Sequence, residues 1–150
     1  MILIIRSFNE HMFNESGVAV NAREVVERVL ETSLSADVER FVELMAPDGV
    51  IEWPYRPEGV PETLNGRDEI RAFMATGGRL IKFETHVDVV IHETADPEVV
   101  IVEYTVHGHV AATGAPFTQR VIAVIRVRDG FIVHYRDYIN PLPLMAVLGS

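Results

Sequence analysis

The chain is 150 residues long and 48% of its residues are hydrophobic, which indicates one folded globular domain rather than a disordered chain. The formal net charge of −9 argues against a nucleic-acid partner, and the absence of cysteine excludes disulfides, thiol nucleophiles and cysteine metal sites. No apolar run approaches the roughly 20 residues that span a membrane, so we expect no membrane partner and, by elimination, a cytoplasmic location.

The first part of the chain, residues 1–20, shows no clear hydrophobic period. We expect an N-terminal extension there, which either forms a small strand at residues 2–5 or is mobile throughout. A single domain is expected over residues 21–150, because no repeat, low-complexity tract or linker interrupts them.

Three helices are predicted in the first half of this domain. Asn21 suits the N-cap of the first helix, and Ser35 suits the N-cap of the second, which Pro47 is expected to end. Gly66 opens the third helix, and the glycine pair at 77–78 is expected to stop it. Apolar residues recur at helical spacing in all three, so each helix is expected to bury one face.

The other predicted elements are strands. A short strand at residues 50–53 precedes a proline-rich stretch that forms a loop or a broken strand. Long strands are predicted at residues 80–93, 98–112, 117–128 and 131–139, the first of them with a bulge because its alternation is imperfect. Helices grouped before an antiparallel sheet indicate the α+β class. A sheet that curves around helices tends to enclose a pocket on its concave side.

The last predicted strand carries one acid in an apolar row. Side chains two apart share a strand face, so Val133, Tyr135, Asp137 and Ile139 are expected to line up together. Burial without a partner raises the pKa of a carboxyl group, which makes it useful for proton transfer near neutral pH. The alternative is that Asp137 pairs with an arginine and closes the edge of the sheet.

Several passages of the chain resemble the SnoaL-like and ketosteroid-isomerase-like families. They are the helix-to-strand passage VERFVELMAPDGVIEWP, the helix NGRDEIRAFM, the hairpin VRDGFIVHYRDYINPL and the terminal LGS. The resemblance covers residues 21–150 and implies the fold of nuclear transport factor two, a cone-shaped α+β domain whose curved antiparallel sheet wraps around N-terminal helices. None of these motifs specifies a reaction, so function has to be argued from the pocket.

Departures from the family patterns narrow the chemistry that the resemblance implies. Trp53 stands where ketosteroid isomerases have their general base, and Ala123 stands where they have a second acid. The Arg-x-Asp element of the limonene-epoxide-hydrolase relatives is absent from residues 98–112. The run RDYINP is most similar to SnoaL-like cyclases and to phenazine-biosynthesis A/B type proteins, which use an acid on the last strand. The resemblance therefore implies a catalytic role for Asp137.

Two histidines, His107 and His109, share one face of a predicted strand with Glu103. This face is either solvated or turned toward the pocket, where His107 would transfer protons beside Asp137 and Glu103 would contact the ligand. A zinc site would need a third close ligand, so we expect no metal, and no cofactor is implied. His86 lies on a polar strand face unless the predicted bulge turns it inward to contact the ligand.

Aromatic and apolar side chains could form the pocket wall. Trp53 and Tyr55 either belong to the core or line the pocket mouth and stack on the ligand. Phe73, Met74 and Tyr135 are candidates for the rest of the wall, with core packing as the alternative for each.

The strand at residues 117–128 is apolar on both faces, which indicates that both faces are covered. Helices would cover one face and a second copy of the chain the other, so a homodimer through the sheets is expected. Together these features predict a small cofactor-independent enzyme for acid/base chemistry (isomerisation, cyclisation, dehydration or hydrolysis) on an apolar small molecule. The alternative is a non-enzymatic dimeric domain that holds a ligand or acts as a scaffold.

Overall fold

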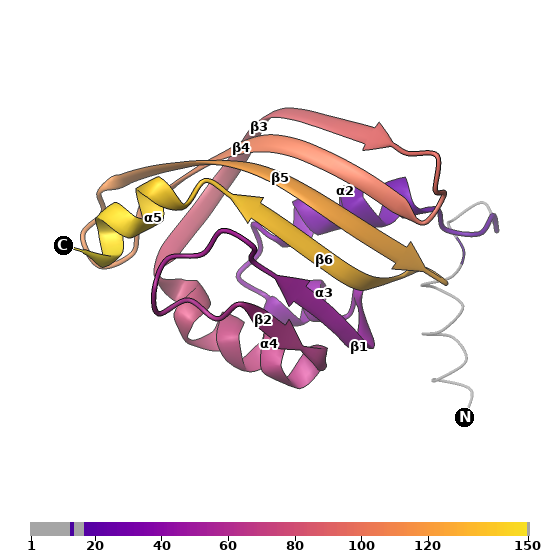
Figure 1. The fold of residues 1–150 in the computed structure, drawn as a ribbon, viewed down its shortest axis with the longest axis horizontal. Coiled ribbons are helices and arrows are strands. Elements are labelled where there is room, and N and C mark those ends of the chain that lie inside the picture. Colours follow the sequence, from indigo (N-terminus) through magenta and orange to yellow (C-terminus); the bar gives the residue numbers. More distant parts are fainter. Residues whose placement is uncertain (1–12, 14–16, 150) are drawn as a thin grey trace.

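The computed structural model describes residue 13 and residues 17–149, and the small strand expected at residues 2–5 lies outside them. The described part confirms the α+β class: one six-stranded sheet in the order β2-β1-β6-β5-β4-β3, with helices packed against it (Figure 1). All neighbouring strands are antiparallel except β1 and β6, which run parallel. The strands are β1 (Met45–Glu52), β2 (Thr63–Asn65), β3 (Ile81–Glu93), β4 (Val99–Val110), β5 (Pro116–Arg128) and β6 (Phe131–Ile139).

The described helices are α2 (Ala22–Thr32), α3 (Val38–Val42), α4 (Gly66–Ala75) and α5 (Pro141–Leu148), and a 3-10 turn follows α4 at Gly77–Arg79. Asn21 caps α2 as predicted, because its side chain accepts a hydrogen bond from the backbone N–H of Glu24 at 2.9 Å. The predicted cap of the second helix is wrong, since Asp37 caps α3 instead of Ser35. Pro47 does not end that helix but lies within β1, in the stretch where the register of β1 against β6 is interrupted and a missing N–H is tolerated.

The core lies between the helices and one face of the sheet. Figure 1 shows β3–β6 arching over α2, with α3 and α4 on the same side. The side chains that meet there are almost completely enclosed: Val25, Val26, Val29, Val42, Met45, Ile70, Val102, Ala123, Ile125 and Ile132. The face that packs on the helices is called the inner face below, and the opposite face the outer face.

Strand β3 contains the predicted bulge and a second one. Its register against β4 shifts between Phe83 and Thr85 and again between Val87 and Val90. Each shift inserts one extra residue and therefore exchanges the faces of the residues that follow. The first bulge turns His86 to the inner face, opposite Val106. The second bulge exchanges the faces again, so that Ile91 lies on the inner face opposite Val102. Asp88 lies within this bulge, and its φ of 54° is in the left-handed region.

Strand β6 corrects one detail of the predicted alternation. Its register against β5 shifts where Val127 pairs with Ile132 and Arg126 pairs with His134, which leaves Val133 as the extra residue. Ile132, with no exposed surface, therefore joins Tyr135 on the inner face in place of Val133. Beyond the bulge, Tyr135, Asp137 and Ile139 share the inner face as expected.

The outer face of β5 is open in the single chain. Ile122 on that face is 46% exposed. The second copy expected to cover this face stays a prediction. No helix in the described part of the chain is long and apolar enough to cross a membrane.

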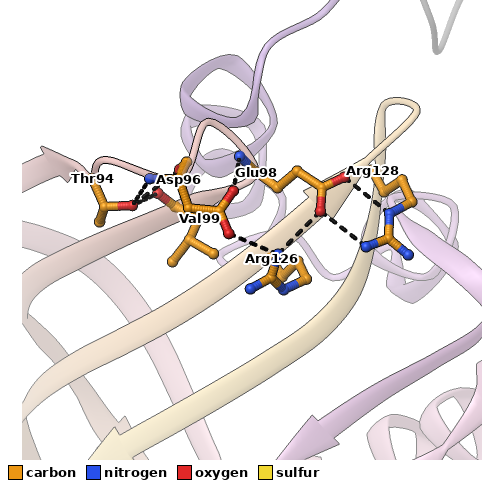
Figure 2. A network of polar contacts seen from close by, with 6 residues as sticks. All are labelled: Thr94, Asp96, Glu98, Val99, Arg126 and Arg128. Atoms are coloured by element: carbon orange, nitrogen blue, oxygen red, sulfur yellow. Dashed lines mark hydrogen bonds and ion pairs between the residues drawn. The ribbon is translucent and has the colours of Figure 1, made fainter.

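The turn between β3 and β4 is held by a network of ion pairs, shown in Figure 2. Glu98 accepts hydrogen bonds at 2.9 Å from Arg128 and at 3.0 Å from Arg126, and Arg126 also reaches Asp96 at 3.0 Å. These bonds, led by those of Arg128, lower the pKa of Glu98 to about 2.

Replacing Glu98 with glutamine is therefore expected to lower the urea midpoint modestly at pH 7. A carboxylate with a lowered pKa stabilises the fold above its ordinary pKa of 4.5, and that contribution disappears as the pH falls through about 2. Urea unfolding at pH 7, 4 and 3 checks this, with the exposed Glu93→Gln as control. An equal difference between variant and wild type at all three pH values would contradict it.

Candidate active site

A cavity of about 580 Å³ lies between the helices and the inner face of the sheet. This volume falls within the range of small-molecule sites. Its wall is mainly apolar. The side chains in it that carry a hydrogen-bonding or charged group are Ser33, Ser35, Trp53, Arg79, Lys82, His86, Tyr104, Gln119, Tyr135 and Asp137.

Asp137 is brought into this cavity by the inner face of β6. Ala123 lies opposite it on β5, and on its other side the chain leaves β1 at Trp53. The indole N–H of Trp53 donates a hydrogen bond to Oδ2 of Asp137 at 3.0 Å. The other carboxylate oxygen, Oδ1, is enclosed and has no hydrogen-bond partner among the described residues. The residue as a whole is part-buried and lines the cavity, whereas Oδ1 itself is enclosed.

The surroundings of Asp137 raise its pKa. Burial raises the pKa of the carboxyl group from its ordinary 3.8 to about 6, and the hydrogen bond from Trp53 opposes this only in part. No arginine pairs with Asp137 among the described ion pairs, and the adjacent Arg136 has the opposite strand phase. A carboxyl group in this state changes its charge near neutral pH, as a general acid or base requires.

Two tyrosines lie close enough to Asp137 for its negative charge to change the pKa of their hydroxyl groups. Burial raises the pKa of the Tyr104 and Tyr135 hydroxyls, and the negative charge of Asp137 raises both further. Both hydroxyls therefore stay protonated, and a hydrogen bond joins them, with Tyr135 as the donor and Tyr104 as the acceptor. The indole N–H of Trp53 is already donated to Asp137, so the Tyr104 hydroxyl is the group of these three that can donate to a ligand.

His86 is the histidine that the structure places in the cavity. Its ring meets Tyr104 edge-on at 4.9 Å between centroids, and its Nε2 lies 3.5 Å from Oγ of Ser33. Burial lowers the pKa of this imidazole below its ordinary 6.5, so the ring is mainly neutral at pH 7. A neutral imidazole offers one donor and one acceptor nitrogen to a ligand.

The other predicted wall residues are divided between the cavity and the surface. Trp53, Phe73, Met74 and Tyr135 line the cavity, and Trp53 packs on Phe73 with 5.3 Å between ring centroids. Tyr55 does not line it: the side chain is 61% exposed and meets Tyr138 on the outer side. The prediction for Tyr55 failed because β1 ends at Glu52, so strand alternation does not extend to residue 55.

Glu103 and His107 lie on the outer face of β4 and do not reach the cavity. Glu103 contacts His92 at 2.6 Å, and Nδ1 of His107 lies 2.9 Å from the hydroxyl of Thr118. The structure therefore corrects the expectation that His107 works beside Asp137, because the inner face of β4 belongs to the alternate residues Tyr104 and Val106. No group of three potential metal-binding side chains occurs within the described residues.

Gln119 and Tyr104 are cavity residues that the sequence analysis did not select. Gln119 lies in the same strand phase as Val121, Ala123 and Ile125, so it is a polar side chain in an apolar row. The reasoning that selected Asp137 would also have found Gln119. Tyr104 gave no comparable signal, because an aromatic residue in an apolar row is ordinary core.

Replacing Trp53 with phenylalanine is expected to raise the pKa of Asp137 above about 6. The indole N–H stabilises the charged carboxylate, and its loss leaves both oxygens without a donor. The variant should also lose about 1–3 kcal/mol of stability at pH 8, and less at pH 5, where the carboxyl group is protonated. NMR titration of the Asp137 carboxyl carbon and urea unfolding measure the two effects. Phe73→Leu, which keeps the indole, is the control, and an unchanged pKa in Trp53→Phe would contradict the prediction.

Comparison with known proteins agrees with the fold that the sequence implied, since solved structures of similar fold include proteins described as having a ketosteroid isomerase-like fold and as NTF2-like. Residues 26–135 match the model of the SnoaL-like domain, and the chain belongs to this family.

Two curated relatives cover most of the chain. The uncharacterized protein YesE of Bacillus subtilis is 35% identical over 129 residues, which are 86% of this chain and 88% of YesE. The uncharacterized PhzA/B-like protein PA3332 of Pseudomonas aeruginosa is 37% identical over 136 residues, 87% of this chain and 92% of that protein.

Solved structures show the same fold. A Bacillus subtilis structure described as "Putative Isomerase" has a TM-score of 0.79 at 35% sequence identity. The aligned region is 85% of this chain and 92% of the chain in that structure. A phenazine biosynthesis-related protein from Pseudomonas aeruginosa has a TM-score of 0.70 at 22% sequence identity. The aligned region is 85% of this chain and 80% of that protein's chain.

Proposed function

We propose that this chain is a small cofactor-independent enzyme that carries out acid/base chemistry on an apolar small molecule held in the cavity. Asp137 acts as the general base, or as the proton donor when it is protonated. Oδ1 of Asp137 carries the proposal, since it is the one enclosed side-chain polar atom without a hydrogen-bond partner among the described residues. An enclosed carboxylate oxygen without a partner destabilises the fold, and a proton or a ligand donor removes that penalty.

The surrounding groups have supporting roles in this proposal. Trp53 orients the carboxylate, while Tyr104, which accepts a hydrogen bond from Tyr135, donates one to oxygen on the ligand or to charge that develops on it. His86, and not His107, is the histidine that exchanges a hydrogen bond with the ligand, at a position separate from Asp137. Phe73 and Met74 enclose the apolar body of the ligand.

The class of reaction is proton removal next to a carbonyl group, as in isomerisation or cyclisation. The similar proteins described as a phenazine biosynthesis-related protein, a "Putative Isomerase" and, in Pseudomonas putida, a "putative polyketide cyclase" are in keeping with this class.

Deuterium exchange tests the proposal with simple carbonyl compounds in place of the natural substrate. Apolar carbonyl compounds that raise the melting temperature are incubated with the protein in D₂O, and NMR follows deuterium uptake at the carbon next to the carbonyl. We expect catalysed uptake by wild type and background uptake by Asp137→Asn. Compounds that bind equally to both proteins without catalysed exchange would favour the non-enzymatic ligand-binding alternative.

A further inference from the structure

A second polar position lies in the cavity, on β5 at some distance from Asp137. Gln119 is 6% exposed and lines the cavity between apolar neighbours. Its Nε2 donates a hydrogen bond to the backbone carbonyl of Asn140 at 3.3 Å, and its carbonyl oxygen has no partner among the described residues. This oxygen is not among the enclosed atoms without a partner, so it has accessible surface and can accept a hydrogen bond from a ligand.

The sheet register places Gln119 and His86 in one row across three neighbouring strands. Val106 on β4 pairs with His86 on one side and with Gln119 on the other. Neighbouring strands are about 4.8 Å apart, so the Cα atoms of His86 and Gln119 are separated by about 10 Å, with Val106 between them. Both side chains are on the inner face. They are called the polar pair below, although Val106 lies between them in the row.

This polar pair is well separated from the acid. Asp137 is opposite Ala123 on β5, and Gln119 is four residues from Ala123 along that strand. At about 3.4 Å per residue, the two polar positions lie about 14 Å apart along the strand direction. The wall between them on β5 and β6 is apolar, with Val121 and Ile139 opposite each other.

We propose that Gln119, together with His86, recognises the end of the ligand remote from Asp137, so that the ligand is an elongated apolar molecule with a hydrogen-bonding group at each end. The proposal rests on the proposed function, in that one end of the ligand is the group that meets Asp137. The amide of Gln119 accepts a hydrogen bond through its carbonyl oxygen and donates one through its remaining N–H. It therefore fits a hydroxyl or carbonyl group at the remote end.

Two rigid probes test this arrangement by isothermal titration calorimetry. 4-Phenylphenol has one hydroxyl group, and 4,4′-dihydroxybiphenyl has one at each end of the same skeleton. Because a neutral hydrogen bond contributes about 1 kcal/mol, we expect the dihydroxy compound to bind wild type about 3- to 10-fold more tightly. In Gln119→Met, a variant of similar side-chain length, that advantage should disappear while the affinity for 4-phenylphenol stays the same.

Thr118→Val is the matched control, because Thr118 neighbours Gln119 in sequence but belongs to the outer face. The Thr118→Val variant should still bind 4,4′-dihydroxybiphenyl more tightly than 4-phenylphenol. Equal binding of the two probes to wild type would overturn the proposal, and this comparison does not depend on how well any variant folds. Equal weakening of both probes in Gln119→Met would also overturn it, since a merely structural role gives that result.

Failure here is distinguishable from failure of the proposed function. If neither probe binds wild type, the two-ended ligand class is wrong, whereas the role of Asp137 is judged separately by deuterium exchange. If both probes bind equally while Asp137-dependent exchange is observed, only the role of Gln119 is lost.

Discussion

Replacing Asp137 with asparagine is expected to reduce turnover by about 10²- to 10⁴-fold, the range that a general acid or base contributes. The substitution keeps the shape of the side chain and an oxygen that can accept from Trp53, but the amide cannot take up a proton near neutral pH. Ligand affinity should change little, because the apolar wall is intact. Turnover and Kd for a compound found by deuterium exchange measure the two effects, with Glu103→Gln on the outer face as control. Full turnover by the asparagine variant would refute the role of Asp137.

The same substitution is expected to change how stability depends on pH. The folded state raises the pKa of Asp137 from 3.8 to about 6, so it holds a proton that the unfolded chain has already lost between these values. Stability therefore falls as the pH rises from about 4 through about 6, by about 3 kcal/mol in total. The asparagine variant escapes this loss, so its stability relative to wild type should be higher at pH 7.5 than at pH 4. Urea unfolding at both pH values checks the sign, and a pH-independent difference would contradict the raised pKa.

Replacing Gly108 with alanine is expected to destabilise the protein by about 3 kcal/mol, which lowers the melting temperature by about 6–12 °C. A Cβ atom at Gly108 would lie 2.1 Å from the backbone oxygen of Lys82 and 2.9 Å from Cα of Phe83. Both obstacles are main-chain atoms of β3 next to the first bulge, so the strand itself would have to move. The rings of Phe83 and Phe117, the residues paired with Gly108 on either side, meet each other with 6.2 Å between centroids.

Gly78→Ala is the control for this substitution, because a Cβ atom there would meet its nearest neighbour at an ordinary 3.5 Å. Thermal and urea unfolding of the two variants measure the difference. If the two alanine variants were equally stable, the close packing of β3 on β4 at Gly108 would be wrong. Displacement of β3 should also weaken ligand binding, since His86 follows the bulge on that strand.

Features that depend on local sequence were predictable. Alternation placed Tyr135, Asp137 and Ile139 on one face, and this holds because a strand repeats every two residues where no bulge interrupts it. Asn21 capped α2 and Gly66 opened α4, since caps and turns use groups within a few residues of each other.

The failures at the site occurred where distant groups decide the outcome. Tyr55 was expected in the core or at the pocket mouth because it has the strand phase of Trp53, but β1 ends at Glu52. His107 and His86 are both histidines on strands of mixed polarity, and alternation by itself could not tell which of them faces inward. The register of β3 against β4 decided it, because an inserted residue in β3 turns His86 inward while unbroken pairing of β4 with β5 leaves His107 outside.

The sequence by itself determined that this is an α+β domain with a carboxyl group in an apolar row of its last strand. The tertiary structure alone decided what that carboxyl group meets. Trp53 is 84 residues away along the chain, yet its indole donates to Oδ2, while Oδ1 is enclosed without a partner. Local spacing fixes the face on which a side chain lies, but burial and hydrogen bonding, which set its pKa, arise only when separate elements pack together.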